Sequence, residues 1–277
     1  MIQIKSKEQL FTWTSPIVMG VININDDSFY SGSRLTDEEE IVHRTKKMIE
    51  EGAAIIDMGA ASSRPGSEPP TVKDEIQRVT MAVEACKKNI PNAVISVDTY
   101  RHEVADAAIQ CGAMIINDIS SGTLDPKIHE VVAKYDVAYI AMHMKGTPKT
   151  MQNNPQYDDL IFEINQYFLS LDEDLKSKGI YNWIVDPGFG FGKTIQHNYE
   201  LLFNLEALRI INKPILVGIS RKSMIYKLLD KKPEDVLPGT TALHWEALIS
   251  GADILRVHDV KEAVQLTNLF QKTAGWR

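Results

Sequence analysis

Short apolar segments recur along the chain at similar intervals. Each is almost continuously apolar rather than alternating, which is typical of strands buried on both faces of a parallel sheet. The eight segments lie at residues 17–23, 53–59, 93–99, 113–119, 137–143, 182–188, 214–220 and 252–258. The pattern therefore predicts eight strands, with other elements between them.

The intervening segments have the periodicity of amphipathic helices. Apolar residues between 41 and 49 fall on one face of a helix, and the sequence Thr36-Asp37-Glu38-Glu39 predicts a capping box at its start. Gly52, Gly112 and Gly251 each precede a predicted strand, where a helix often ends in a left-handed residue. Strands and helices are therefore expected to alternate.

Two α/β architectures accept this alternation. A doubly wound open sheet usually has fewer strands and often a glycine-rich first turn, and the first predicted strand here is not followed by G-x-G-x-x-G. Eight units within 277 residues favour a closed (β/α)8 TIM barrel. Because no linker divides the chain, we predict a single domain over residues 1–277, in which residues 1–15 form an N-terminal extension that covers the barrel bottom.

Composition and charge narrow the class of protein. A formal net charge of −7 and a pI near 5.5 argue against nucleic acid as a partner. Two cysteines are too few for a disulfide framework, and no stretch resembles a signal peptide or a membrane span. A cytoplasmic protein without membrane contact is therefore expected.

Polar residues occur at the carboxyl ends of nearly all the predicted strands. In a TIM barrel these ends meet on one face, which carries the chemistry. Burying such groups is costly unless they have partners, so a polar ligand is expected there. The residues are Asn23, Asp57, Asp98, Asn117, Asp118, His143, Asp186, Ser220, Lys222, Arg256 and His258. Asp57 and Asp118 could equally serve only to fix loops.

The cations among these residues suggest an anionic ligand. Arg64, Lys222 and Arg256, with the imidazole of His258, suit a phosphate or diphosphate. Arg64 and Lys222 could instead be solvated loop charges. The segment DPGFGFGKT at 186–194 is not a phosphate-binding P-loop, because its glycine spacing is one residue short.

The carboxylates and amides suggest a flat heterocycle beside that anion. Asp98, Asn117 and Asp186, with Lys222, could bind the donor and acceptor edges of a guanine-like ring. Phe191 and Met142 could supply apolar surface to this ring or could be core residues. Ser223 is expected to contact a substrate carboxylate, because it lies near a predicted helix start. Asn23 is expected to bind Mg²⁺, and His143 is expected to be a structural histidine.

Ordered motifs along the chain resemble those of dihydropteroate synthase. They are MGVIN at 19–23 with DDSF at 26–29, SSRPG at 62–66, SVDTY at 96–100, INDIS at 116–120, MHMKGTPKTMQ at 142–152, DPGFGFGK at 186–193, GISRKS at 218–223 and RVHDV at 256–260. Each motif is weak alone, but their order covers the chain from about residue 17 to 265.

The resemblance implies a TIM-barrel transferase of folate biosynthesis and a sulfonamide target. Such enzymes join p-aminobenzoate to 6-hydroxymethyl-7,8-dihydropterin diphosphate and release pyrophosphate. It also implies Mg²⁺ as cofactor and a homodimer, with the helices after the sixth to eighth strands as the place to look for the dimer contact.

The resemblance also implies roles for single residues. Asn23 would bind Mg²⁺, and the diphosphate would be held by Ser63, Arg64, Arg256 and His258. The pterin ring would be read by Asp98, Asn117, Asp186 and Lys222 and lined by Met142, while Lys222 and Ser223 border the aminobenzoate. Asp98, Lys222, Arg256 and His258 are the expected catalytic residues.

The chain departs from the family pattern in two loops. Asn25-Asp26 stands where Thr-Pro is common, which restores a backbone N–H and adds an anion. Ala60-Ala61 replaces a Gly-Glu pair, and Ser63 replaces the commoner threonine.

Two alternatives remain open. A pterin-binding methyltransferase barrel would share the ring-binding residues but would not need the cations of SRKS and RVHDV. A non-catalytic barrel that binds a pterin would be consistent with the changed first loop.

Overall fold

The predicted strands and helices are present in a computed structural model. It describes residues 2–24, 34–60, 70–147, 150–151 and 154–273, with side chains in the first helix from Glu38 onward. The strands that follow the predicted apolar segments are β3 (Ile17–Asn23), β4 (Ile55–Gly59), β5 (Ile95–Asp98), β6 (Ile115–Asp118), β7 (Ala138–Met142), β8 (Trp183–Asp186), β9 (Leu216–Val217) and β10 (Ile254–Val257).

These strands form one parallel sheet that closes on itself. Their order is β8-β7-β6-β5-β4-β3-β10-β9, with each neighbouring pair parallel. Between β8 and β9 the N–H of Val185 donates to the carbonyl of Pro214 at 2.9 Å, and Val185 forms a parallel bridge with Ile215. The predicted (β/α)8 TIM barrel is confirmed.

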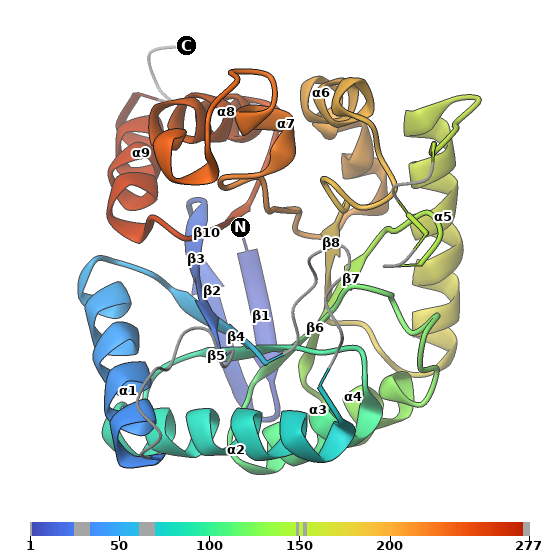
Figure 1. The fold of residues 1–277 in the computed structure, drawn as a ribbon. Helices are drawn as coiled ribbons and strands as arrows, with labels where there is room; N and C mark the ends of the chain where they lie inside the picture. Colours follow the sequence, from blue (N-terminus) through green and yellow to red (C-terminus); the bar gives the residue numbers. More distant parts are fainter. Residues whose placement is uncertain (1, 25–33, 61–69, 148–149, 152–153, 274–277) are drawn as a thin grey trace.

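Helices surround the sheet (Figure 1). They are α1 (Arg34–Glu50), α2 (Val72–Asn89), α3 (His102–Gln110), α4 (Ile128–Tyr135), α5 (Leu160–Ser177), α6 (Ile195–Phe203), α7 (Ser223–Tyr226), α8 (Leu237–Ile249) and α9 (Val260–Thr273), with 3₁₀ turns η2 (Leu205–Ile211) and η3 (Pro233–Asp235). Their apolar faces and the outward-facing strand residues form the larger core. Among the described residues, no helix is both long and apolar enough to cross a bilayer.

An N-terminal hairpin covers one end of the barrel. β1 (Ile2–Ser6) and β2 (Gln9–Trp13) pair antiparallel, and Ile2 and Ile4 are buried. These two isoleucines share an apolar cluster with residues at or near the amino ends of the strands, including Ile17, Ile115 and Ile254. The hairpin therefore lies at the barrel bottom, opposite the strand ends that carry the polar residues.

The helix ends differ in part from the prediction. α1 begins at Arg34, so Thr36 lies inside its first turn, and the predicted start at a Thr36 cap is wrong. Gly52, Gly112 and Gly251 follow helix ends with φ of 104°, 112° and 98°, conformations that cost glycine little because it lacks Cβ.

Candidate active site

Arg256 joins two strand-end carboxylates at the mouth of the barrel. Its Nε donates to Asp57 Oδ2 at 2.7 Å, and its Nη2 donates to Asp98 Oδ2 at 2.8 Å. The residues come from β10, β4 and β5, and β3 lies between β10 and β4 in the sheet. Two partly or fully buried carboxylates therefore fix the orientation of one guanidinium.

Asp57 extends this cluster to the next strands. Its Oδ2 also accepts from Asn117 Nδ2 at 3.0 Å, whereas its buried Oδ1 has no hydrogen-bond partner among the described residues. The sequence left the role of Asp57 open, and its contacts place it in the site. Burial raises the pKa of Asp98, and the charge of Arg256 opposes that shift.

Lys222 follows β9, the strand that pairs with β10 on the side away from β3. Its Nζ donates to the carbonyl of Phe189 at 2.6 Å and lies 5.0 Å from the centre of the Phe191 ring. Burial lowers the pKa of Lys222 to about 8, although the carboxylate of Asp186 acts to raise it. Asp186 ends β8, and its Oδ1 accepts from the backbone N–H of Gly188 at 2.8 Å.

Ser220, after β9, and His258, after β10, contact each other at the mouth of the barrel. Ser220 Oγ lies 3.0 Å from His258 Nδ1, which fixes the imidazole beside the segment that follows β9. Arg221 binds Asp259 through two hydrogen bonds of 2.8 and 2.7 Å. It is therefore occupied by an ion pair, and Ser223 begins the short helix α7 next to it.

Two of the strand-end residues, Asp118 and His143, are held by groups of neighbouring loops. Asp118 accepts from Ser120, Gly122 and the hydroxyl of Tyr139, so it fixes the loop after β6. His143 is buried, its Nδ1 lies 3.0 Å from Lys193 Nζ, and burial lowers its pKa to about 2. These contacts agree with the prediction of a structural histidine. Met142, which ends β7, is also buried.

Most of the residues predicted to contact the diphosphate and the metal from the first two loops are not among the residues that the structure describes. Ser63 and Arg64, and the departures at Asn25 and Asp26, lie outside the described residues. Asn23, the predicted Mg²⁺ ligand, is an exposed residue at the end of β3. Its amide oxygen is a hard donor of the kind that Mg²⁺ takes when phosphate and water supply the other ligands.

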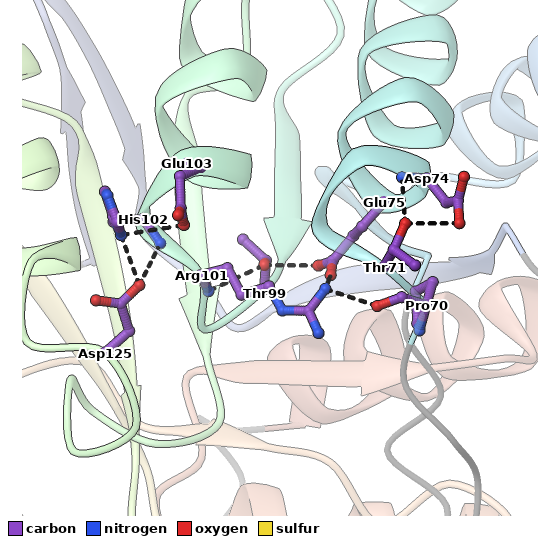
Figure 2. Close-up of polar contacts among 9 residues, drawn as sticks. All are labelled: Pro70, Thr71, Asp74, Glu75, Thr99, Arg101, His102, Glu103 and Asp125. Atoms are coloured by element: carbon purple, nitrogen blue, oxygen red, sulfur yellow. Dashed lines mark hydrogen bonds and ion pairs between the residues drawn. The ribbon is translucent and has the colours of Figure 1, made fainter.

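Arg101 and His102, in the segment after β5, each take part in a further polar cluster (Figure 2). Arg101 Nη1 donates to Glu75 Oε2 at 2.7 Å and to the carbonyl of Pro70 at 2.8 Å. Beside it, Asp125 Oδ2 accepts from both the backbone N–H and Nδ1 of His102 at 2.8 and 2.7 Å, which anchors the start of α3. Neither cluster includes a predicted site residue, but Arg101 and His102 follow Asp98 closely in sequence.

The site can hold a polar ring and an anion together. Asp98, Asn117, Asp186 and Lys222 are brought to one face with Arg256 and His258. Sequence reasoning missed Lys193 and the carbonyl of Phe189, and only the charge of Lys193 within an apolar, glycine-rich segment could have drawn attention to it.

Comparison with known proteins identifies the family. The model of the pterin binding enzyme family matches residues 19–258. Dihydropteroate synthase of Escherichia coli strain K12 is 43% identical over 260 residues, which cover 93% of this chain and 92% of the relative. That of Synechocystis is 40% identical over 274 residues, covering 98% and 94%.

Solved structures agree. Yersinia pestis dihydropteroate synthase in a sulfonamide drug complex superposes with a TM-score of 0.92 at 37% identity and covers all of both chains. Xanthomonas albilineans dihydropteroate synthase with 4-aminobenzoic acid gives 0.90 at 34% identity, covering 98% of each. This chain therefore belongs to the dihydropteroate synthase family, whose members are transferases of folate biosynthesis.

Proposed function

We propose that the strand-end residues of this chain carry out the family reaction in the following way. The C–O bond between the pterin methylene carbon and the diphosphate breaks, and the amine of p-aminobenzoate forms a new C–N bond to that carbon. Pyrophosphate leaves, and the amine loses one proton. The observation that carries the proposal is the cluster in which Arg256 binds both Asp57 and Asp98, with Asn117 attached through Asp57.

Asp98, Asn117, Asp186 and Lys222 bind the pterin ring in this proposal. Carboxylates and amides match the donor and acceptor edges of an aminopyrimidine ring. Positive charge develops on the methylene carbon as the diphosphate departs, and the carboxylate of Asp98 stabilises it. Met142 and Phe191 supply apolar surface, and Ser223 and Lys222 border the aminobenzoate carboxylate.

Arg256 and His258 stabilise the charge on the departing diphosphate, together with Ser63 and Arg64. Asp57 and Asp98 already hold the guanidinium of Arg256 in one orientation, which reduces the reorganisation needed during the reaction. Asn23 would hold Mg²⁺, which neutralises charge on the diphosphate when bound.

The assay that tests this proposal is pyrophosphate release from dihydropterin diphosphate and p-aminobenzoate with Mg²⁺. We expect one dihydropteroate for each pyrophosphate, and a fall in kcat of about 10²–10³-fold for Arg256→Ala. Arg209→Ala is the matched control, because Arg209 binds Asp253 at the other end of β10 at 2.8 and 3.1 Å. Pterin binding without pyrophosphate release would favour a non-catalytic barrel. Methyl transfer from methyltetrahydrofolate would favour the methyltransferase.

The order of bond breaking and the role of Asn23 in Mg²⁺ binding are tested by separate experiments. We infer a dissociative substitution, so a single turnover without p-aminobenzoate should still release pyrophosphate, and its absence would favour a concerted displacement. Asn23→Ala should raise the Mg²⁺ concentration needed for half-maximal activity. An unchanged requirement would remove Asn23 from the metal site.

We infer that the protein is a cytoplasmic homodimer. Exposed apolar residues on and after α7 to α9 support a contact there, since Leu228, Ile249 and Leu269 are 61%, 51% and 54% exposed. Sedimentation should give twice the chain mass, and Leu228→Asp with Leu269→Asp should halve it. Phe162→Asp, at an equally exposed position on α5, should leave it unchanged.

A further inference from the structure

Lys193 is a buried lysine to which the proposed reaction gives no role. It is 3% exposed and lies between β8 and α6. Its Nζ is 3.0 Å from His143 Nδ1, 3.0 Å from the carbonyl of Gly188 and 3.2 Å from the carbonyl of Phe191. An ammonium has three N–H donors, which these three acceptors can receive, and the carbonyl oxygen of His143 lies slightly further away at 3.4 Å.

A lysine in this position is costly to keep. Burial lowers its pKa to about 7, and a buried charge is often less favourable than an apolar side chain of similar volume. Methionine would fill the same space without that cost. The ammonium is therefore best explained by the geometry that it imposes on its acceptors.

Those acceptors belong to two different strand-end loops. His143 directly follows β7, whereas Gly188 and Phe191 follow β8. The two backbones are in close contact, since a Cβ added at Gly188 would lie 1.9 Å from the carbonyl oxygen of His143. Lys193 bridges the two loops at this contact.

The loop that Lys193 holds also surrounds Lys222. The carbonyl of Phe189 accepts from Lys222 Nζ, and the Phe191 ring lies beneath it. The backbone N–H of Gly188 binds the carboxylate of Asp186. A shift of this loop would therefore displace the partners of two residues proposed to bind the pterin.

We propose that Lys193 is a positioning residue for the substrate pocket. Its ammonium fixes the loop after β8 against the end of β7, and this sets the Phe189 carbonyl and the Phe191 ring around Lys222. The inference rests on the proposed function, because that function assigns Lys222 and Asp186 to the pterin.

Lys193→Met tests the role, and Lys87→Met is its matched control. Lys87 also donates to two backbone carbonyls, those of Pro91 and Ala93 at 2.6 and 3.1 Å, but it precedes the amino end of β5, away from the mouth. We expect kcat/KM for the dihydropterin diphosphate to fall about 10²-fold in Lys193→Met, with its KM raised, because small displacements of a positioned group cost that much. Lys87→Met should lose thermal stability and keep its kinetic constants.

A second variant separates positioning from folding. Lys193→Gln keeps two N–H donors for the carbonyls of Gly188 and Phe191, so its kcat/KM should lie between those of wild type and Lys193→Met. The proposal is overturned if folded Lys193→Met retains kcat/KM within twofold of wild type, or if Lys87→Met loses as much. It is also overturned if both Lys193 variants fail to fold while Lys87→Met folds, because the role is then stability alone. An inactive wild-type protein would instead contradict the proposed function.

Discussion

The charge of Lys222 is set by neighbours from several strand ends. Burial lowers its pKa to about 8, while the carboxylates of Asp186 and Asp98 raise it and Arg256 lowers it. Its folded pKa therefore lies below the ordinary lysine value of 10.5, so the ammonium is lost as pH rises through about 8. A group that binds substrate through that ammonium should show this loss in the kinetics.

We expect kcat/KM for the dihydropterin diphosphate to fall as pH rises above about 8. Lys222→Arg should be slower at every pH, because arginine does not reproduce lysine geometry. It should also lack the limb near pH 8, because a guanidinium stays protonated throughout the accessible range. A fall near pH 7 should remain in both proteins, because burial lowers the pKa of Lys193 to about 7 and its ammonium positions the same loop. The measurement is a pH profile of kcat/KM for both proteins. A limb near pH 8 that persists in Lys222→Arg would assign the titration to another group.

Some residues of the site could be predicted from their positions alone. Asp98, Asn117 and Asp186 stand at strand ends, where a barrel brings polar groups together. The pairing of Arg256 with Asp57 could not be predicted from the sequence. The two residues are 199 positions apart, and either side chain could have bound a ligand or solvent instead. Lys193 was missed because its acceptors are two backbone carbonyls and a histidine from another strand, which no spacing in the sequence encodes.

At the scale of elements, an ion pair connects α2 with the turn after β5 (Figure 2). Glu75, in the first turn of α2, is almost fully buried, and its Oε2 accepts from Arg101 Nη1 at 2.7 Å. Its Oε1 accepts from the hydroxyl of Thr99 at 2.7 Å. Burial raises the pKa of Glu75, and both partners act against that shift. Thr99 directly follows Asp98, so the pair fixes the chain next to a proposed catalytic residue.

Arg101→Met should lower the free energy of unfolding by about 3–5 kcal/mol, because it leaves a buried carboxylate without its counter-ion. The double variant Arg101→Met with Glu75→Gln should recover much of that loss, since no buried charge then remains. Urea denaturation of the two single variants and the double variant measures the coupling. Strictly additive losses would mean that the two side chains do not stabilise each other.

The elements themselves were predictable to different degrees. Long apolar runs marked all the barrel strands because both faces are buried, although most strand ends were placed one to three residues too wide. The β1–β2 hairpin was not predicted as strands, because five alternating residues are too short a pattern to separate from a loop. The start of α1 was misplaced because Thr36 and Glu39 have capping spacing but lie within the helix.

At the scale of the whole molecule, the two ends of the barrel have different tasks. The carboxyl ends of the strands gather charged residues, and the amino ends gather apolar ones under the hairpin. The net charge of −7 is therefore no obstacle to an anionic substrate, because the cations Lys222 and Arg256 lie at the mouth. A change at the bottom should affect stability without changing the chemistry.

Ile4 provides the sharpest test of that separation. It belongs to β1 and is fully buried, and Met19, Ile115 and Ile254 of the barrel strands share its apolar cluster. Ile4→Ala should therefore lower the free energy of unfolding by about 2–5 kcal/mol, through lost burial and the cavity that remains. Leu10→Ala, at a 60% exposed position in β2, should change it by less than about 0.5 kcal/mol.

Both variants should keep wild-type kcat and KM under conditions in which they are folded, because the hairpin lies at the opposite end from Arg256 and Lys222. Urea denaturation with steady-state kinetics on the same preparations measures both quantities. Equal stability of Ile4→Ala and Leu10→Ala would mean that the hairpin does not seal the barrel. A folded Ile4→Ala protein with altered KM would show that the bottom of the barrel is coupled to the substrate pocket through the strands.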